Sequence, residues 1–272
     1  ESGNVYPLGR PSFWKGSDIP RQAQLPNRYY FIRIRCRFYL KEGKLPFIQI
    51  KSNPRYKATE MLKTSDIYYK KYRDSNNEIQ DTKVTMTMTC VDYKLFLEHY
   101  DTEELEILDG CWFYADKGIF DRYIDKYKEI KMREKGAKRT EAKLFLNNLY
   151  GKMATSTISS FKIAHEGLMG ELDYTINTEN NKNPVFIAVG SAITSYSRNF
   201  TIRAAQANYH GADKRGFKYA DTDSIHCDLE PEQIKGIKVD DNAFCCWKLE
   251  SQWDKAIFVR QKTYIEHMRI DN

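Results

Sequence analysis

Several familiar signals are missing from this 272-residue sequence. No apolar run reaches the roughly 20 residues that a membrane-spanning helix needs, and the first residues do not form a signal peptide. The six cysteines show no C-x-x-C spacing, and the adjacent pair Cys245-Cys246 cannot easily bond to each other. A disulfide framework is therefore disfavoured, and we expect reduced thiols in an intracellular protein. No internal repeat is present, so a repeat architecture is not indicated.

The amino-acid composition supports a substantial hydrophobic core. Hydrophobic residues make up 41% of the chain and aromatic residues 14%, enough for one large domain or two modest ones. The formal net charge of +6 is mildly basic, so nucleic acid is a plausible partner but not a required one. The chain starts at Glu1 without a Met and ends directly after a strand-like run. We therefore expect a fragment of a longer polypeptide.

The first part of the chain is expected to become regular only after about thirty residues. Residues 1–30 are rich in Pro, Gly and Trp without periodicity, which predicts an irregular surface segment. Residues 30–40 alternate between apolar and polar side chains, which predicts a strand, and residues 45–51 are expected to return as its partner. The polar face of the first strand carries Arg33, Arg35 and Arg37. This face could line a phosphate track or be the solvated side of a half-buried hairpin.

The next stretch is polar and then alternates again. Residues 52–83 combine basic and tyrosine side chains, which is typical of single-strand binding surfaces but also of a mobile insertion. Strands are predicted over residues 84–90 and 105–114. Between them, Asp92 is expected to cap a short helix that ends near Tyr100.

The middle of the chain changes to a helical period. An apolar stripe begins at Ile119 and is broken at Gly136, and a second helix is predicted over residues 137–154, giving an antiparallel helical hairpin. Residues 156–183 are polar, which suggests a long loop or a small β insertion. Residues 185–209 predict a helix whose many small side chains suit close packing on a sheet.

The last quarter contains a strand, a tight turn and a strand over residues 217–229. In extended geometry, Asp221 and Asp223 would project to the same side of the crest. Two carboxylates that close repel unless a cation lies between them, and Mg²⁺ binds one or two carboxylates plus substrate phosphates. A solvated turn would have the same residues, because turns favour Asp and Ser. Further strands are predicted over residues 247–253 and 256–270.

The helix predicted over residues 137–154 has two different faces. The apolar stripe consists of Ala142, Phe145, Leu146, Leu149 and Met153. The other side carries Arg139, Lys143, Asn147 and Tyr150 and ends at Gly151. Cations at this spacing suit a triphosphate, a ring could pack on a sugar or base, and glycine allows close backbone approach. An ordinary amphipathic helix with a basic solvent face would look the same.

Three motifs carry a resemblance to a known family. Residues 143–151 (K-L-F-L-N-N-L-Y-G) resemble the K-x-x-x-N-S-L-Y-G motif of family B DNA polymerases, with Asn148 in place of the usual Ser. Residues 219–224 (Y-A-D-T-D-S) resemble the family's Y-x-D-T-D-S motif, and residues 262–264 (K-T-Y) its K-x-Y motif. The motifs follow the family's order. The similarity spans nearly the whole chain and is greatest to the protein-primed phage polymerases.

The resemblance implies an α+β fold. It would consist of a right-hand polymerase palm, an antiparallel sheet backed by helices, with a helical fingers hairpin and two inserted β-rich subdomains. Residues 1–118 would be the first terminal-protein-region insertion and 119–155 the fingers. Residues 156–184 would be a second, β-hairpin insertion, and 185–272 part of the palm.

The resemblance also assigns roles to individual side chains. Two Mg²⁺ ions, with Mn²⁺ as a substitute, would be held by the catalytic carboxylates Asp221 and Asp223. The nucleotide-binding residues would be Lys131, Arg139, Lys143, Asn147, Tyr150 and Gly151. The DNA-binding residues, some of which steady the primer terminus, would be Tyr219, Thr222, Ser224, Lys262, Thr263 and Tyr264.

The implied activity is template-directed nucleotidyl transfer with two metals, in protein-primed replication of a phage-type genome. The implied partners are primer-template DNA, dNTPs and a terminal protein that serves as primer. A monomeric enzyme in the cytoplasm of a bacterial host, encoded by a phage or prophage and without a membrane partner, would fit. The family's first palm motif, an Asp followed by S-L-Y-P, does not occur in the sequence, nor do the exonuclease and thumb. We expect little or no polymerisation by this chain alone.

Two other classes remain open from the sequence. One is a non-catalytic module that binds nucleic acid or a terminal protein. The other is a DxD glycosyltransferase, in which Asp221 and Asp223 would hold Mn²⁺ and a nucleotide-sugar diphosphate. The glycosyltransferase hypothesis leaves the helix motif at 143–151 and the K-T-Y motif at 262–264 unexplained.

Overall fold

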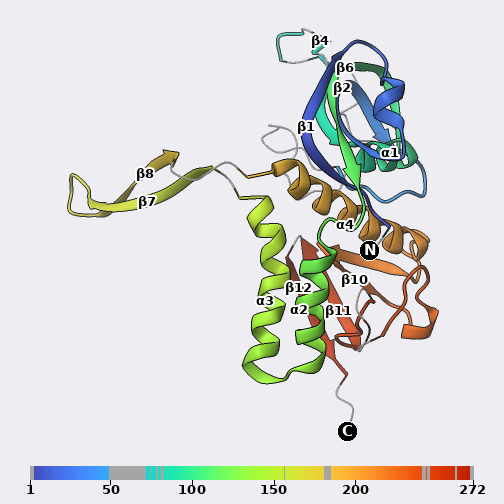
Figure 1. The fold of residues 1–272 in the computed structure, drawn as a ribbon, viewed down its shortest axis with the longest axis vertical. Helices are drawn as coiled ribbons and strands as arrows, with labels where there is room; N and C mark the ends of the chain where they lie inside the picture. Colours follow the sequence, from blue (N-terminus) through green and yellow to red (C-terminus); the bar gives the residue numbers. More distant parts are fainter. Residues whose placement is uncertain are drawn as a thin grey trace. The chain divides into compact units, whose positions relative to one another are not determined.

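The computed structural model divides the chain into two compact units (Figure 1). The first unit combines Glu1–Gly118 with Thr194–Asn272, and the second is Ile119–Ile193. Among the residues described, no helix is both long and apolar enough to cross a membrane. The structure describes residues 3–48, 72–73, 75–77, 79–80, 83–155, 157–180, 185–240, 243, 246–260 and 262–269.

The first unit contains a four-stranded antiparallel sheet with the strand order β1-β6-β2-β5 (Figure 1). Its strands are β1 Tyr6–Lys15, β2 Arg28–Leu40, β5 Val84–Thr89 and β6 Tyr100–Asp116. The alternation predicted for β2 is confirmed, because Ile32, Ile34 and Cys36 are fully buried. Helix α1 (Cys90–His99) packs on this face, with Phe38 and Phe96 ring centroids 5.5 Å apart. Burial of a large apolar side chain such as Ile32 or Phe96 stabilises the fold by about 1.5–3 kcal/mol relative to leaving it exposed.

Residues 6–15 form a strand, so the prediction of an irregular segment over residues 1–30 is wrong. β1 is at the edge of the sheet, where proline is tolerated because one row of N–H groups needs no partner. Its register with β6 shifts between Leu8 and Ser12, where Gly9 has φ +71°. These local features hide the strand from a search for alternation.

The partner strand predicted over residues 45–51 is also wrong for its described part, residues 45–48. The N–H of Leu45 bonds to Gln206 Oε1 at 2.8 Å, and the N–H of Phe47 bonds to the Tyr100 hydroxyl at 2.8 Å. Side chains therefore take up donors that a strand ladder would use, and β2 pairs with β5 and β6 instead. The remainder of 45–51, and most of the polar stretch 52–83, lie outside the described residues.

The helix predicted near Asp92 is present, but its cap is a different residue. Thr89 is the N-cap, and its hydroxyl accepts the N–H of Asp92 at 3.1 Å. Asp92 lies in the first turn, where its negative charge interacts favourably with the helix dipole and stabilises the helix. Its carboxylate accepts hydrogen bonds from Ser195 Oγ and Arg198 Nη1, both at 2.7 Å. This cluster ties α4 (Ile187–Ala207) to the sheet.

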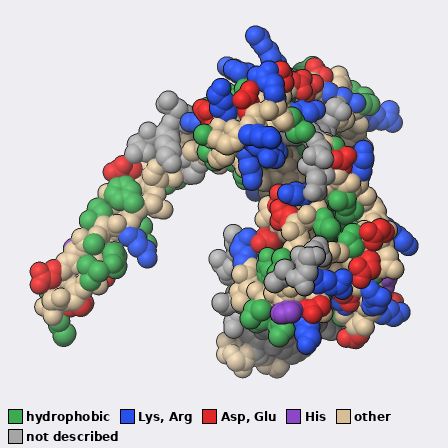
Figure 2. Space-filling model, turned by 90° about the horizontal axis from the view of Figure 1, so that it is seen from below, with side chains coloured by type: hydrophobic (Ala, Val, Ile, Leu, Met, Phe, Trp, Pro, Cys, Tyr) green, Lys and Arg blue, Asp and Glu red, His purple; other side chains and the backbone are tan. Residues whose placement is uncertain are grey.

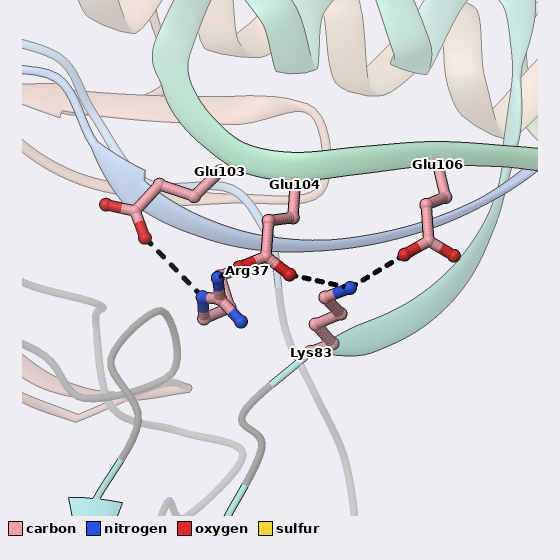
Figure 3. A network of polar contacts seen from close by, with 5 residues as sticks. All are labelled: Arg37, Lys83, Glu103, Glu104 and Glu106. Atoms are coloured by element: carbon pink, nitrogen blue, oxygen red, sulfur yellow. Dashed lines mark hydrogen bonds and ion pairs between the residues drawn. The ribbon is translucent and has the colours of Figure 1, made fainter.

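Two arginines of β2 are paired with carboxylates of β6, and Figure 3 shows the cluster around one of them, Arg37. Arg33 pairs with Asp109, and Arg37, only 4% exposed, pairs with Glu103 and Glu104. The bonds from Lys83 and Arg37 lower the pKa of Glu104 to about 2. This arrangement favours a structural role for these arginines over a phosphate track.

The second unit contains a helical hairpin and a β-hairpin, as predicted. Its elements are α2 Asp121–Arg133, α3 Gly136–Met153, β7 Ile158–Glu166, β8 Leu172–Asn180 and the start of α4. Tyr127 stacks on Phe145 with ring centroids 4.6 Å apart, and Tyr123 donates a hydrogen bond to the carbonyl of Phe145 at 2.9 Å. Of the predicted apolar stripe of α3, only Ala142 is buried. Hydrophobic side chains also lie exposed along the β7–β8 hairpin (Figure 2).

Two further hairpins complete the first unit. Their strands are β9 Phe217–Asp221, β10 Ser224–Cys227, β11 Trp253–Arg260 and β12 Thr263–Met268. The predicted 217–229 hairpin is confirmed. The strand predicted over residues 247–253 is wrong, because Trp247 forms only an isolated bridge with Val239 and β11 begins at Trp253. The single strand predicted over 256–270 is instead parts of β11 and β12, with their turn between.

The first unit also contains four short elements. They are the 3₁₀ turns η1 Arg21–Gln24 and η3 Pro231–Gln233 and the two-residue strands β3 Tyr72–Arg73 and β4 Ile79–Gln80. Several small residues of α4 are buried, with Ala205 fully buried, whereas Ala207 is exposed. Ala205 packs in one cluster with Phe217 of β9 and Leu45, which fixes the base of the β9–β10 hairpin.

Candidate functional site

The first candidate site is the crest of the β9–β10 hairpin. Asp221 pairs with Ser224 across the ladder, so Thr222 and Asp223 form the turn. Thr222 has φ +51°, a costly conformation for a β-branched residue. Its carbonyl accepts a hydrogen bond of 3.0 Å from Thr201 Oγ1 on α4. Because the backbone leaves extended geometry at Thr222, the predicted extended arrangement of Asp221 and Asp223 is wrong.

Asp221 binds a cationic side chain from the second hairpin. Lys262 Nζ lies 2.6 Å from Asp221 Oδ2 and 2.9 Å from Oδ1. Thr222 Oγ1 donates to Asp221 Oδ1 at 3.0 Å, and Ser224 Oγ donates to the Asp221 carbonyl at 3.1 Å. The hydrogen bonds from Lys262, and then from Thr222, hold the pKa of Asp221 below its usual value. Asp223 is exposed beside this pair.

Aromatic rings join the two hairpins below the Asp221–Lys262 pair. The Tyr219 hydroxyl accepts the backbone N–H of Lys262 at 2.8 Å, and Tyr219 stacks on Phe258 with centroids 5.4 Å apart. Tyr264 lies 5.3 Å from Tyr219, centroid to centroid. Lys262 has φ +57°, and Thr263 is exposed at the start of β12. The structure thus brings residues of the 219–224 and 262–264 motifs together.

The sequence patterns did not reveal two residues that lie in this cluster. His226 Nδ1 donates to Glu266 Oε1 at 2.6 Å, and both side chains are largely buried. In the β9–β10 register, His226 lies directly opposite Tyr219. A two-residue turn at Thr222 and Asp223 puts His226 opposite Tyr219, so the length of this turn would have predicted that the two side chains share a face. Nothing local indicates that Glu266 joins it.

The second candidate site is one face of α3. Arg139, Lys143, Asn147 and Tyr150 are all exposed. Within the described part of the chain, the side chains of Arg139 and Lys143 make no ion pair or hydrogen bond. A Cβ built at Gly151 would meet no atom within 4 Å, so the unit itself leaves space there. Lys131 lies half-buried on α2.

A cavity of about 480 Å³ lies in the same unit, and the sequence did not predict it. It is lined by Tyr123, Phe145, Asn148, Leu149, Gly151, Lys152 and Thr155. Most of these positions on α3 are turned away from the Arg139–Lys143 face at 100° per residue. Of the predicted nucleotide-binding residues, only Gly151 borders this cavity.

The carboxylates of the first site fit part of a magnesium site. In the described residues, no group of three or more His, Cys, Asp or Glu side chains is placed to hold a metal ion. Asp221 nevertheless already holds a cation, the Lys262 ammonium, and Asp223 adds a second hard oxygen ligand nearby in the chain. Mg²⁺ is commonly bound by one or two carboxylates plus substrate phosphates, so this donor set suits Mg²⁺ when a substrate completes it.

The chain matches the family model of DNA polymerase type B, organellar and viral, over residues 3–241. It therefore belongs to this family of DNA polymerases, and the resemblance carried by the three motifs is confirmed.

Its relatives include DNA polymerases of several phages. That of Bacillus phage Nf is 38% identical over 266 residues and that of Streptococcus phage Cp-1 34% identical over 267 residues. These alignments cover 97% of this chain but only 42% and 43% of the relatives. The chain thus spans less than half of their length.

A solved structure of Phi29 DNA polymerase with primer-template DNA and incoming nucleotide substrates is also similar. Its TM-score is 0.76 at 36% identity, covering 98% of this chain and 43% of that chain. This similarity confirms the predicted α+β polymerase class.

Proposed function

We propose that this chain supplies the primer-terminus and nucleotide-binding surfaces of a DNA-directed DNA polymerase that performs template-directed nucleotidyl transfer in protein-primed replication. The observation that carries the proposal is the contact between Asp221 and Lys262. These residues are 41 positions apart in two different motifs, and they meet with Tyr219 and Tyr264 in one cluster. A solvated turn would not require such a constellation.

In this proposal Asp221 and Asp223 hold two Mg²⁺ ions, or Mn²⁺, together with substrate phosphates. Bound metal supplies charge neutralisation at the phosphates and a lower pKa for the attacking hydroxyl. Lys262 keeps Asp221 ionised before the substrate arrives and then steadies the primer terminus. The remaining DNA contacts are made by Tyr219, Thr222, Ser224, Thr263 and Tyr264.

The exposed face of α3 would bind the incoming dNTP. Arg139 and Lys143 would meet successive phosphates, because their cations are spaced one helical turn apart and are not neutralised by carboxylates in the described residues. Asn147 and Tyr150 would line the nucleotide pocket. Gly151 would let the nucleotide approach the backbone closely, and Lys131 would add a further positive charge.

The proposed subdomains follow the sequence order. Residues 1–118 would act as the first terminal-protein-region insertion and 119–155 as the fingers. Residues 156–184 would be the second insertion, and 185–272 the palm. Primer-template DNA, dNTPs and a terminal protein would be the partners of a monomer in the cytoplasm of an infected bacterium.

The test is metal-dependent binding of a fluorescent dNTP to the chain, measured by anisotropy. We expect Arg139→Ala and Lys143→Ala each to weaken binding about tenfold, because each removes a charge-assisted hydrogen bond. Lys138→Ala is the matched control, since Lys138 is an exposed lysine of the same helix outside the proposed face. Equal affinities for all three variants would refute the proposed nucleotide site.

A second candidate function, left open by the sequence, is a non-catalytic module that binds nucleic acid or a terminal protein. Asp221→Ala separates the two candidates. If the metal site assembles, metal-dependent dNTP binding falls sharply, whereas a non-catalytic module is unaffected. Family membership argues against the DxD glycosyltransferase.

A further inference from the structure

In the described residues, the contact between His226 and Glu266 is the less exposed of the two side-chain pairs of opposite charge type that join the hairpins. The side chains are 15% and 10% exposed, whereas Lys262, which also joins the hairpins, is 66% exposed. The carboxylate of Glu266 is an acceptor, so His226 carries a proton on Nδ1 and donates it. Hydrogen bonds to a charged group in a largely buried position are among the stronger side-chain contacts.

The surroundings of His226 hold its ring in place. Ring centroids of Tyr264, Tyr219 and Phe258 lie 5.0, 5.3 and 5.5 Å from that of His226. Two of these rings come from the β11–β12 hairpin and one from β9. The imidazole therefore has little freedom to turn away, and its hydrogen bond fixes Glu266 and with it the course of β12.

The hydrogen bond between His226 and Glu266, called the bridge below, is connected by further contacts to the crest of the β9–β10 hairpin. β12 begins directly after Lys262, whose backbone N–H bonds to the hydroxyl of Tyr219 and whose ammonium bonds to Asp221. His226 lies opposite Tyr219 in the β9–β10 ladder. Because the Tyr219 hydroxyl accepts the backbone N–H of Lys262, the His226–Glu266 contact is connected to Lys262 through Tyr219. Bridge and crest thus form one connected set of contacts.

We propose that His226 and Glu266 are positioning residues that hold the β11–β12 hairpin against the β9–β10 hairpin, so that the Lys262 ammonium contacts the Asp221 carboxylate. The proposal rests on the proposed function, because its consequence is the placement of the primer terminus. Both residues act through Lys262 and neither contacts the substrate itself.

The direct test is NMR of the Lys262 side-chain ammonium in the ¹⁵N-lysine-labelled chain, assigned with Lys262→Met. An ammonium held by Asp221 exchanges slowly and gives a signal, whereas a released one does not. We expect His226→Phe, which keeps an aromatic ring but removes the donor, to abolish the signal. Glu266→Leu should do the same, and Glu266→Gln, which retains an acceptor, should preserve it.

The matched control is His267→Phe. His267 belongs to the same strand and bonds to Asp254 at 2.7 Å, but this pair is exposed. The control should leave the Lys262 signal unchanged. Retention of the signal in either His226→Phe or Glu266→Leu would overturn the proposal, as would its loss in the control or in Glu266→Gln. If His226→Phe fails to fold, the two Glu266 variants and the control decide alone.

The functional consequence is measured separately, by the affinity for primer-template DNA. We expect His226→Phe to raise the dissociation constant about tenfold and to add little to the effect of Lys262→Met in the double variant. A fully additive effect would mean that His226 acts independently of Lys262 and would overturn the proposal. The NMR signal is observed without DNA or nucleotide, so failure of the polymerase function would leave the positioning test intact.

Discussion

Two basic arrays in this molecule look alike in the sequence and differ in the structure. On β2, Arg33 and Arg37 bond to carboxylates of β6 that lie 66 to 76 residues further along the chain. On α3, Arg139 and Lys143 are exposed and have no such partner among the described residues. From residue spacing alone, each array could be either a phosphate-binding surface or a solvated basic face. What separates them is whether the fold delivers negative charge to the cations, and that depends on long-range strand pairing.

The largest expected effect concerns the buried member of the first array. Arg37→Met should lower the free energy of unfolding by about 2 kcal/mol, less than the 3–5 kcal/mol typical of breaking a buried pair, because its glutamates are half exposed. Denaturant unfolding measures the change. Arg33→Met is the matched control, since Arg33 is about half exposed, and should lower the free energy of unfolding much less. Equal small losses for the two variants would mean that the β2 array is a solvated face, like the array on α3.

A carboxylate introduced beside the second array should make it resemble the first. Asn147→Glu places an acid four residues after Lys143, where the two side chains can pair. We expect dNTP affinity to fall about tenfold, equivalent to about 1.4 kcal/mol, while unfolding free energy changes by under about 0.5 kcal/mol. Asn147→Gln is the control for loss of the amide geometry. If the two variants bind dNTP equally, the free positive charge of α3 is not what matters.

The acid dependence of stability offers a third, smaller contrast. The folded-state pKa of Glu104 is about 2 because of its hydrogen bonds from Lys83 and Arg37, which is below its unfolded value. The stability it contributes is therefore complete above about pH 4.5 and is lost as pH falls towards 2. Glu104→Gln should flatten the unfolding free energy against pH in this window. A curve that stays parallel to that of the unsubstituted chain would exclude this contribution.

The sequence predicted those elements whose signal is local. The alternation of β2, the two helices around Gly136 and the hairpin at Asp221 were all found, because side-chain period and turn residues act over a few positions. It failed for β1, whose prolines and Gly9 are accommodated at an edge. It also failed for residues 45–48, whose N–H groups bond to side chains distant in sequence.

The candidate site divides in the same way. Asp221 and Lys262 could be predicted by motif resemblance, but their direct contact could not. His226 and Glu266 were missed because their meeting depends on how two hairpins pack, not on either hairpin's own pattern. Pairing between elements far apart in sequence is what separates the observed site from the predicted one.

Lys262 is the intermediate case and gives the smallest expected effect. It has a carboxylate partner, as Arg37 has, but it is exposed, as Arg139 is. Exposed pairs contribute little to stability, so Lys262→Met should change the unfolding free energy far less than Arg37→Met does. Lys255→Met, at an exposed lysine of β11, is the matched control. A loss near that of Arg37→Met would mean that the Asp221–Lys262 pair holds the hairpins together. A loss no larger than the control's would mean that the fold leaves this cation free to exchange its carboxylate for a phosphate, as the proposed contact with the primer requires.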